Sequence, residues 1–224
     1  MIRDRLMVAL DMPDRKQALK IYQRIGDSAG WFKVGLRLFV AEGPDLIRTL
    51  TRTHRVFLDL KFHDIPNTVA EAVTSAGDLG VHMTNVHAGG GTDMMRAAAQ
   101  SAAAFPRMKL IAVTVLTSSS MEPGEARREA VQRAMMARDA GLDGVVCSVH
   151  EVADIKQVCG TNFLTVTPGI RWGEHTHDDQ KRVADPAMAM HQGADYIVVG
   201  RPIIHASDPH AAALEALAMM RRRP

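Results

Sequence analysis

Eight short runs of apolar and β-branched residues recur along the chain, and a longer segment with helical character follows each of them. The runs are Leu6–Leu10, Trp31–Val34, Val56–Leu60, Met83–Val86, Leu110–Leu116, Gly144–Cys147, Leu164–Val166 and Tyr196–Val199. Most of them are continuously apolar, which is typical of parallel strands that are covered on both faces. The chain between two runs suits one helix and two loops. This alternation predicts an α/β fold built on a parallel sheet.

Helix signals fill the segments between the apolar runs. Ala, Met and Arg, which favour helices, are frequent there, and proline occurs where a first helical turn tolerates it. We expect helices over Arg15–Ile25, from Pro66, over Met94–Ala104, over Glu125–Ala140 and from Pro209. We find no composition break or flexible linker that would mark a domain boundary.

Two α/β architectures contain this many strand–helix units, an open doubly wound sheet and a closed barrel. An open sheet usually carries a glycine-rich first turn, whereas the first turn here, residues 9–14 (ALDMPD), has no glycine. A barrel collects its active site from the carboxyl ends of all eight strands. The ends of the predicted strands all carry polar residues: Asp11, Lys33, Asp59, Lys61, His87, Thr114, Thr117, Ser148, His150, Thr167 and Arg201. We therefore predict a (β/α)8 TIM barrel that forms a single domain over residues 1–224.

Composition excludes several classes of partner. The net charge is +2, and Arg221, Arg222 and Arg223 at the end of the chain exceed it, so no basic nucleic-acid footprint is expected. Aromatic residues make up only 4% of the chain, too few for base-stacking platforms. No apolar stretch is long enough to span a membrane or to form a signal peptide core. The two cysteines form no metal or disulfide motif, which suits a cytoplasmic protein.

The segment around Asp59 and Lys61 is the most informative part of the chain. In a regular strand, residues two apart share a face, so both side chains should point to the barrel interior. Lys33 and Asp11 end the two preceding strands, and Asp64 follows in the next loop. Lys61 is expected to be an ammonium because nearby carboxylates favour the charged form. The array is either a structural ion-pair network or a catalytic site with Lys61 as proton donor, and its position at strand ends favours the catalytic reading.

A second polar group lies in the last two strand–helix loops, where barrels often bind phosphate. Residues 167–171 (TPGIR) and 200–203 (GRPI) each combine a glycine with an arginine. Glycine lets backbone amides approach an oxyanion, and arginine supplies a two-pronged donor. The polar stretch Arg171–Gln180 is long enough for a lid. These loops predict a phosphorylated ligand.

Motifs for other chemistries are weak. We find no metal-binding motif of defined spacing, and we therefore expect no catalytic metal. The glycine-rich stretch His87–Asp93 lacks the spacing of a nucleotide-binding loop, so a tight turn is the simpler interpretation. Two competing functions remain on the same barrel, a Schiff-base aldolase and a non-catalytic nucleotide-binding protein.

These residues together resemble the orotidine 5′-phosphate decarboxylase family. The stretch DLKFHDIPNT at Asp59–Thr68 is similar to the signature of that family, and its Ile-Pro-x-Thr end resembles the orotidylate branch rather than a related branch that uses a metal on sugar phosphates. The likeness continues in order through Ala9–Asp11, Lys33–Gly35, Asn85–Gly91, Ala112–Ser118, Asp143–Glu151, Thr167–Arg171, Asp178–Arg182 and Val198–Ile203.

The resemblance implies a cofactor-free homodimer that converts orotidine 5′-phosphate to uridine 5′-phosphate and CO2, the last step of de novo UMP synthesis. It implies that Lys61 is the proton donor, that Asp59 lies against the departing carboxylate and that Lys33 bridges Asp11 and Asp59. Asp64 would act in the neighbouring subunit's site, so that the two subunits share their active sites. The implied substrate-binding residues are Asp11, Lys33, Asp59, Lys61, Asp64, Ile65, Thr68, Thr117, Ser118, Pro168, Arg171, Gln180, Gly200 and Arg201.

Overall fold

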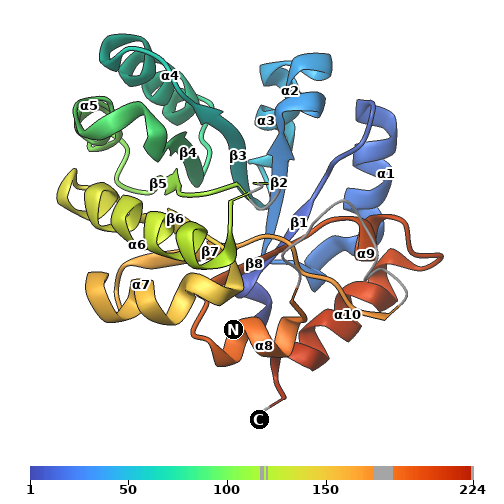
Figure 1. The fold of residues 1–224 in the computed structure, drawn as a ribbon. Helices are drawn as coiled ribbons and strands as arrows, with labels where there is room; N and C mark the ends of the chain where they lie inside the picture. Colours follow the sequence, from blue (N-terminus) through green and yellow to red (C-terminus); the bar gives the residue numbers. More distant parts are fainter. Residues whose placement is uncertain (117–118, 120, 174–183, 223–224) are drawn as a thin grey trace.

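The computed structural model describes residues 1–116, 119, 121–173 and 184–222. Eight parallel strands close into a barrel in chain order, because β1 pairs with both β2 and β8. The strands are β1 (Leu6–Ala9), β2 (Trp31–Gly35), β3 (Arg55–Phe62), β4 (Met83–His87), β5 (Lys109–Val113), β6 (Gly144–Val146), β7 (Leu164–Thr167) and β8 (Tyr196–Val199). Helices surround the strands on all sides (Figure 1). The chain is therefore a (β/α)8 TIM barrel, and this prediction is confirmed.

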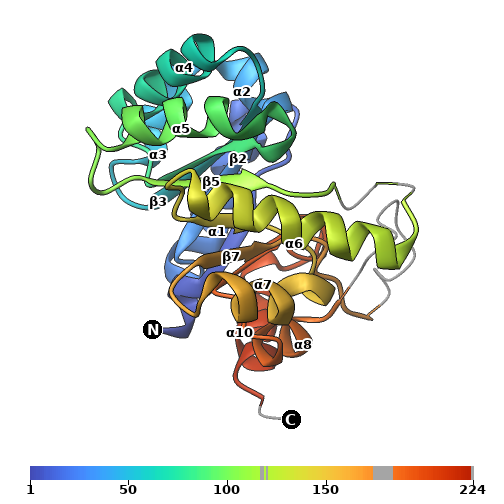
Figure 2. The same ribbon diagram turned by 60° about the vertical axis from the view of Figure 1, so that its left-hand side comes forward.

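The helices connect successive strands on the outside of the barrel. They are α1 (Arg15–Ile25), α2 (Leu36–Glu42), α3 (Pro44–Leu50), α4 (Pro66–Asp78), α5 (Gly91–Ala102), α6 (Pro123–Asp139), α7 (Val152–Cys159), α8 (Pro186–His191), α9 (Arg201–Ile204) and α10 (Pro209–Met220). Neighbouring helices pack on one another as well as on the strands, and α4 and α5 lie side by side in both views (Figures 1 and 2). No helix among the described residues is long and apolar enough to cross a membrane.

The expectation of one helix in every connection is wrong between β2 and β3. Two helices, α2 and α3, fill this connection, and Gly43 separates them with a φ of 66°. This left-handed conformation suits glycine, and Pro44 then begins α3 at a position where a proline needs no amide donor. The pair Gly43-Pro44 is therefore a local sequence signal that one helix ends and another begins.

Strand ends differ from the predicted ones by a few residues. The largest differences are in β3, which extends to Phe62, and in β5, which ends at Val113 rather than at Leu116. Ends of elements depend on the loops that follow, which carry weaker local signals than apolar runs.

The barrel interior changes from apolar to charged along its axis. Large side chains fill the end of the barrel at which the strands begin. The ring centroids of Trp31 and Tyr196 lie 5.5 Å apart there. Met7, Phe57 and Met83 complete this packing, and all three are buried. A separate and larger apolar core lies between the strands and the helices. This packing closes the amino-terminal end of the barrel, so a ligand can enter only from the carboxyl ends of the strands.

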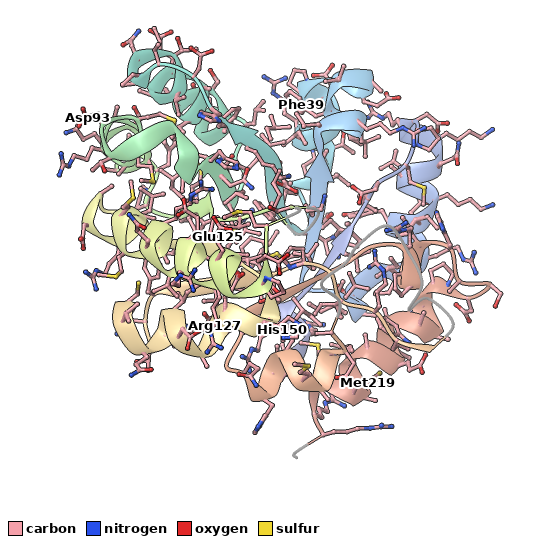
Figure 3. The ribbon with its side chains drawn as sticks, viewed as in Figure 1. Phe39, Asp93, Glu125, Arg127, His150 and Met219 are labelled. Carbon is pink, nitrogen blue, oxygen red and sulfur yellow. The ribbon has the colours of Figure 1, made fainter. Side chains whose placement is uncertain are left out.

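Charged side chains outside the barrel lie on the helical layer (Figure 3). Arg127 on α6, which is labelled there, forms an ion pair with Asp154 on α7, with Nη2 donating to Oδ1 at 2.7 Å. Such exposed pairs contribute little to stability. Two buried charged residues of the described chain, Lys33 and Arg171, instead line a cavity at the carboxyl ends of the strands.

Candidate active site

A cavity of about 190 Å³ opens among the carboxyl ends of the strands. Its polar lining comes from β1 to β3 and from the loops after β7 and β8: Asp11, Lys33, Asp59, Lys61, Arg171 and Gly200. Phe57, Val113, Val146 and Val198 supply apolar walls. The two groups of residues that the sequence suggested, the charged array and the phosphate loops, thus border one cavity.

Four charged side chains form a continuous chain across β2, β3 and the segment that follows β1. Lys33 Nζ lies 3.1 Å from Asp11 Oδ1 and 3.4 Å from Asp59 Oδ2. Lys61 Nζ lies 2.6 Å from the other oxygen of Asp59, Oδ1. Gly35 makes this approach possible, because a Cβ atom there would lie only 3.1 Å from Lys33 Nζ. Two cations and two anions therefore alternate across the mouth of the barrel.

The inner members of this chain are Lys33, which is buried, and Asp59, whose side chain is 13% exposed, and both stay charged. Burial disfavours the charged form of Lys33, but the carboxylates of Asp59 and Asp11 outweigh that effect and raise its pKa. Burial likewise opposes ionisation of Asp59, yet Lys33 and Lys61 hold the pKa of its carboxyl below the usual range. Because each buried charge has an opposite partner, the array can be retained in a water-poor site.

Lys61 adopts an unusual backbone conformation. Its φ is 53°, and it is the only residue other than glycine with a positive φ among the described residues. Left-handed backbone costs a non-glycine residue about 1–2 kcal/mol, and such strain concentrates at functional sites. The pairing of β3 with β4 shifts here, since Leu58 pairs with Thr84 while Phe62 pairs with Val86. The regular alternation that we predicted for this strand is therefore wrong, although Asp59 and Lys61 both reach the cavity.

Asn85 on β4 contacts both ends of this irregular segment and was missed as a site residue. Its Oδ1 accepts a hydrogen bond from the backbone amide of Lys61 at 2.8 Å, and its Nδ2 donates to Asp59 Oδ1 at 2.7 Å. The side chain is fully buried. A polar residue inside an apolar strand is the signal that could have identified it, since buried amides require partners.

The predicted phosphate loops border the same cavity after β7 and β8, and a Cβ atom at Gly200 would lie 3.7 Å from Asp11 Oδ2, so this rim adjoins the charged array. Pro168, Arg171 and Gly200 line the cavity there, and Arg171 is buried, with Nη1 donating to the carbonyl of Ile170 at 2.8 Å. The backbone amide of Arg171 donates to the carbonyl of Ala184 at 2.9 Å, which ties the two ends of the intervening loop together. Arg201 begins α9 directly after Gly200 and is half buried, but it is not among the cavity-lining residues.

The structure does not bring every predicted residue to this cavity. Asp64, Ile65 and Thr68 lie in the exposed segment between β3 and the first turn of α4, and none of them lines the cavity of the same chain. Asp64 instead accepts a hydrogen bond from the backbone amide of Ile65 at 2.7 Å. Three further predicted residues lie outside the described part of the chain: Thr117, Ser118 and Gln180. The predicted lid, Arg171–Gln180, is described only as far as Gly173.

Two histidines stack beside the charged array. The rings of His63 and His87 are nearly parallel, with centroids 5.3 Å apart. His87 Nδ1 accepts a hydrogen bond from the backbone amide of Gly89, which places the proton of the neutral ring on Nε2. Burial, together with His63, Arg133 and Lys61, lowers the pKa of His87. Among the described residues, no group of three or more His, Cys, Asp or Glu side chains could hold a metal ion.

Comparisons with known proteins agree on one family. The model of the orotidine 5′-phosphate decarboxylase / HUMPS family matches residues 4–216. The chain is 50% identical to orotidine 5′-phosphate decarboxylase of Legionella pneumophila strain Paris, covering 92% of this chain and 94% of that protein. It is 48% identical to the enzyme of that name from Moorella thermoacetica, covering 94% and 90% respectively. The crystal structure of orotidine 5′-phosphate decarboxylase from Lactobacillus acidophilus superposes with a TM-score of 0.85 at 38% identity, covering 97% of this chain and 99% of that one.

The fold and the site define a (β/α)8 barrel with a lysine–carboxylate array at the carboxyl ends of its strands. The chain belongs to the orotidine 5′-phosphate decarboxylase / HUMPS family.

Proposed function

We propose that the chain converts orotidine 5′-phosphate to uridine 5′-phosphate and CO2. The observation that carries the proposal is the contact of Lys61 Nζ with Asp59 Oδ1 at 2.6 Å inside the cavity. The family description covers two branches, but the named relatives at about 50% identity are all orotidine 5′-phosphate decarboxylases. No observation favours the metal-dependent sugar-phosphate branch.

The chemistry requires stabilisation of a localised charge. When the bond between the ring carbon and the carboxylate breaks, its electron pair stays on that carbon in the plane of the ring. The π system of the pyrimidine cannot delocalise this pair, so the barrier is high unless a preorganised positive charge lies beside the carbon. The ammonium of Lys61 supplies that charge, and it then transfers a proton to the carbon. Neutral Lys61 regains a proton from solvent after product release.

Asp59 and Lys33 act through their fixed positions. Asp59 orients the ammonium of Lys61 by accepting its hydrogen bond, and in this proposal the substrate carboxylate binds next to Asp59. Repulsion between the two carboxylates favours loss of CO2, a smaller and more disputed contribution than stabilisation of the carbanion. Lys33 balances the charge of Asp59, so the pair stays ionised without substrate. Asp11 and Lys33 are well placed to hold the ribose hydroxyls.

In this proposal the phosphate binds at the loops after β7 and β8. Pro168, Arg171 and Gly200 line the cavity there, and Arg201 and Gln180 complete the proposed phosphate-binding set. Thr117 and Ser118 are proposed contacts of the pyrimidine. Contacts with the phosphate, far from the reacting carbon, can supply the energy that orients the ring and closes the site, which raises kcat and not only affinity.

We further propose that the functional unit is a homodimer in which each chain completes its neighbour's site. Asp64, Ile65 and Thr68 are exposed, and Ile65 keeps 66% of its surface accessible. Docking of a second subunit on this segment would remove the apolar side chain of Ile65 from water. Asp64 and Thr68 would then contact the partner's substrate. Residues 1–224 form one barrel domain in this proposal, and the enzyme acts in the cytoplasm without a cofactor.

A spectrophotometric assay of orotidine 5′-phosphate consumption tests the function directly. We expect conversion by the purified chain that is unchanged after exhaustive chelation. Activity that disappears on chelation and returns with a divalent cation would instead support the metal-dependent branch. Trapping of substrate on a lysine by borohydride would support a Schiff-base aldolase. Binding of uridine 5′-phosphate without any turnover would support the non-catalytic nucleotide-binding function instead.

A further inference from the structure

The strained backbone of Lys61 needs a partner that the regular sheet does not provide. Along β3 the pairing with β4 is interrupted between Leu58 and Phe62, so the backbone amide of Lys61 lies opposite an irregular stretch of the ladder. The side-chain oxygen of Asn85 accepts a hydrogen bond from that amide at 2.8 Å. Asn85 is separated from Lys61 by 24 residues and is held in the middle of β4. A side chain therefore takes the place of a main-chain acceptor at the catalytic lysine.

The orientation of the Asn85 amide follows from its partners. A backbone amide can only donate, so the atom that faces Lys61 must be the oxygen. The amino group of Asn85 then faces Asp59, whose ionised carboxylate can only accept, at 2.7 Å from Oδ1. That same oxygen accepts the hydrogen bond from Lys61 Nζ at 2.6 Å. Asn85 thus fixes both the backbone from which the ammonium extends and the carboxylate that orients it.

Asn85 does not itself reach the ligand site. It is fully buried on β4 and does not line the cavity, whereas Asp59 and Lys61 do. No other side chain of its size combines one acceptor and one donor on a planar group: aspartate lacks the donor, and leucine lacks both. We propose that Asn85 is a positioning residue, which holds Lys61 and Asp59 in the geometry required for proton transfer. This inference rests on the function proposed above.

Two substitutions of Asn85 and one matched control test the proposal. Asn85→Ala removes both hydrogen bonds, and we expect kcat to fall about 100-fold while KM changes little, because small displacements of a catalytic group have effects of this size. Thr84→Val is the control, since the Thr84 hydroxyl donates to the carbonyl of Leu58 at 3.0 Å in the same pair of strands and is equally buried. It removes a β3–β4 hydrogen bond outside the site, so kcat should stay close to that of the parent.

Asn85→Asp gives a readout that a purely structural role would not change. The new carboxylate keeps the acceptor for Lys61 but repels Asp59 while both are ionised. As the pH falls, one of the two carboxyls takes up a proton, which can then form the hydrogen bond between positions 85 and 59. We therefore expect the activity of Asn85→Asp relative to the parent to rise towards acidic pH. The charged and titratable groups around this position are Asp59 and Lys61 on β3, Lys33 on β2, His87 on β4 and Arg133 on α6. His63, which stacks on His87, belongs to the same set. All of these groups are present in both proteins, so the ratio reports the new carboxylate and its coupling to them.

Hydrogen exchange at the Lys61 amide separates this inference from the proposed function. We expect slow exchange of that amide in the parent and in Thr84→Val, and fast exchange in Asn85→Ala. If the parent is inactive towards orotidine 5′-phosphate, the proposed function fails, and the exchange result alone decides whether Asn85 holds Lys61. A folded Asn85→Ala protein with normal kcat overturns the proposal, and so does a Thr84→Val protein that loses kcat to the same degree. If Asn85→Ala does not fold, the pH dependence of Asn85→Asp decides, and a ratio to the parent that is independent of pH overturns the proposal.

Discussion

Lys61 and Asp59 meet at 2.6 Å although the strand that carries both of them is irregular between them. In a regular strand, side chains two residues apart point the same way but stand side by side on the sheet. The left-handed backbone of Lys61 departs from that arrangement, and its ammonium reaches back to the carboxylate. The contact is therefore a property of the irregular segment, and the proposed proton transfer depends on it.

Removal of the Arg201 guanidinium should weaken binding of the phosphate. A charge-assisted hydrogen bond from Arg201 to the phosphate would stabilise the transition state by about 1.5–3 kcal/mol. Arg201→Ala should therefore lower kcat/KM by roughly 10- to 150-fold. The steady-state kinetics of orotidine 5′-phosphate measure this effect, and orotidine without the phosphate should show no comparable loss. Arg127→Ala, which breaks an exposed ion pair on the outer helices, is the matched control. Unchanged kcat/KM in Arg201→Ala would exclude the role.

The charged array should make stability depend on pH at both extremes. The pKa of Asp59 is lowered in the folded state, so its contribution is present above the unfolded value of 3.8 and is lost as the pH falls through the lower folded value. The pKa of Lys33 is raised, so its contribution is present below 10.5 and is lost as the pH rises through the folded value. Urea unfolding of the parent and of Asp59→Asn at pH 5 and at pH 3 measures the acidic arm. We expect the parent to lose more stability over this interval, and equal losses would contradict the assignment.

Sharing of sites between subunits predicts complementation. Asp64→Ala and Lys61→Ala homodimers should each be nearly inactive, but a mixed dimer would contain one site with both residues intact. Mixing the two proteins under conditions that allow subunit exchange should restore part of the activity. Exchange is verified with differently tagged chains. Demonstrated exchange without recovery of turnover would show that Asp64 acts within its own chain or not at all.

The barrel could be predicted from the sequence because its strands are buried on both faces. Burial on both faces requires continuous apolar runs, and these stand out against the helical segments. The array could be predicted for a related reason, since the carboxyl ends of parallel strands meet at one rim. Asp11, Lys33 and Asp59 therefore lie together although they are far apart in the chain.

Other features of the site could not be predicted, because they depend on contacts between residues that are distant in the sequence. The conformation of Lys61 is stabilised by Asn85, which lies on the next strand, so no pattern around Lys61 predicts its positive φ. The second helix between β2 and β3 is a different case, because its signal is local: Gly43 ends one helix with a left-handed backbone and Pro44 begins the next. The position of Asp64 outside the cavity could not be read from its distance of three residues from Lys61, because a loop follows β3 at that point.

Single-turnover and steady-state kinetics of Lys61→Ala test the central claim most directly. The variant removes the ammonium that stabilises the carbanion and supplies the proton, and general acid catalysis alone typically contributes about 10²- to 10⁴-fold. We predict a loss of kcat at least in that range, with uridine 5′-phosphate still bound in a calorimetric titration. Turnover close to that of the parent, in a protein that binds the nucleotide normally, would contradict the account.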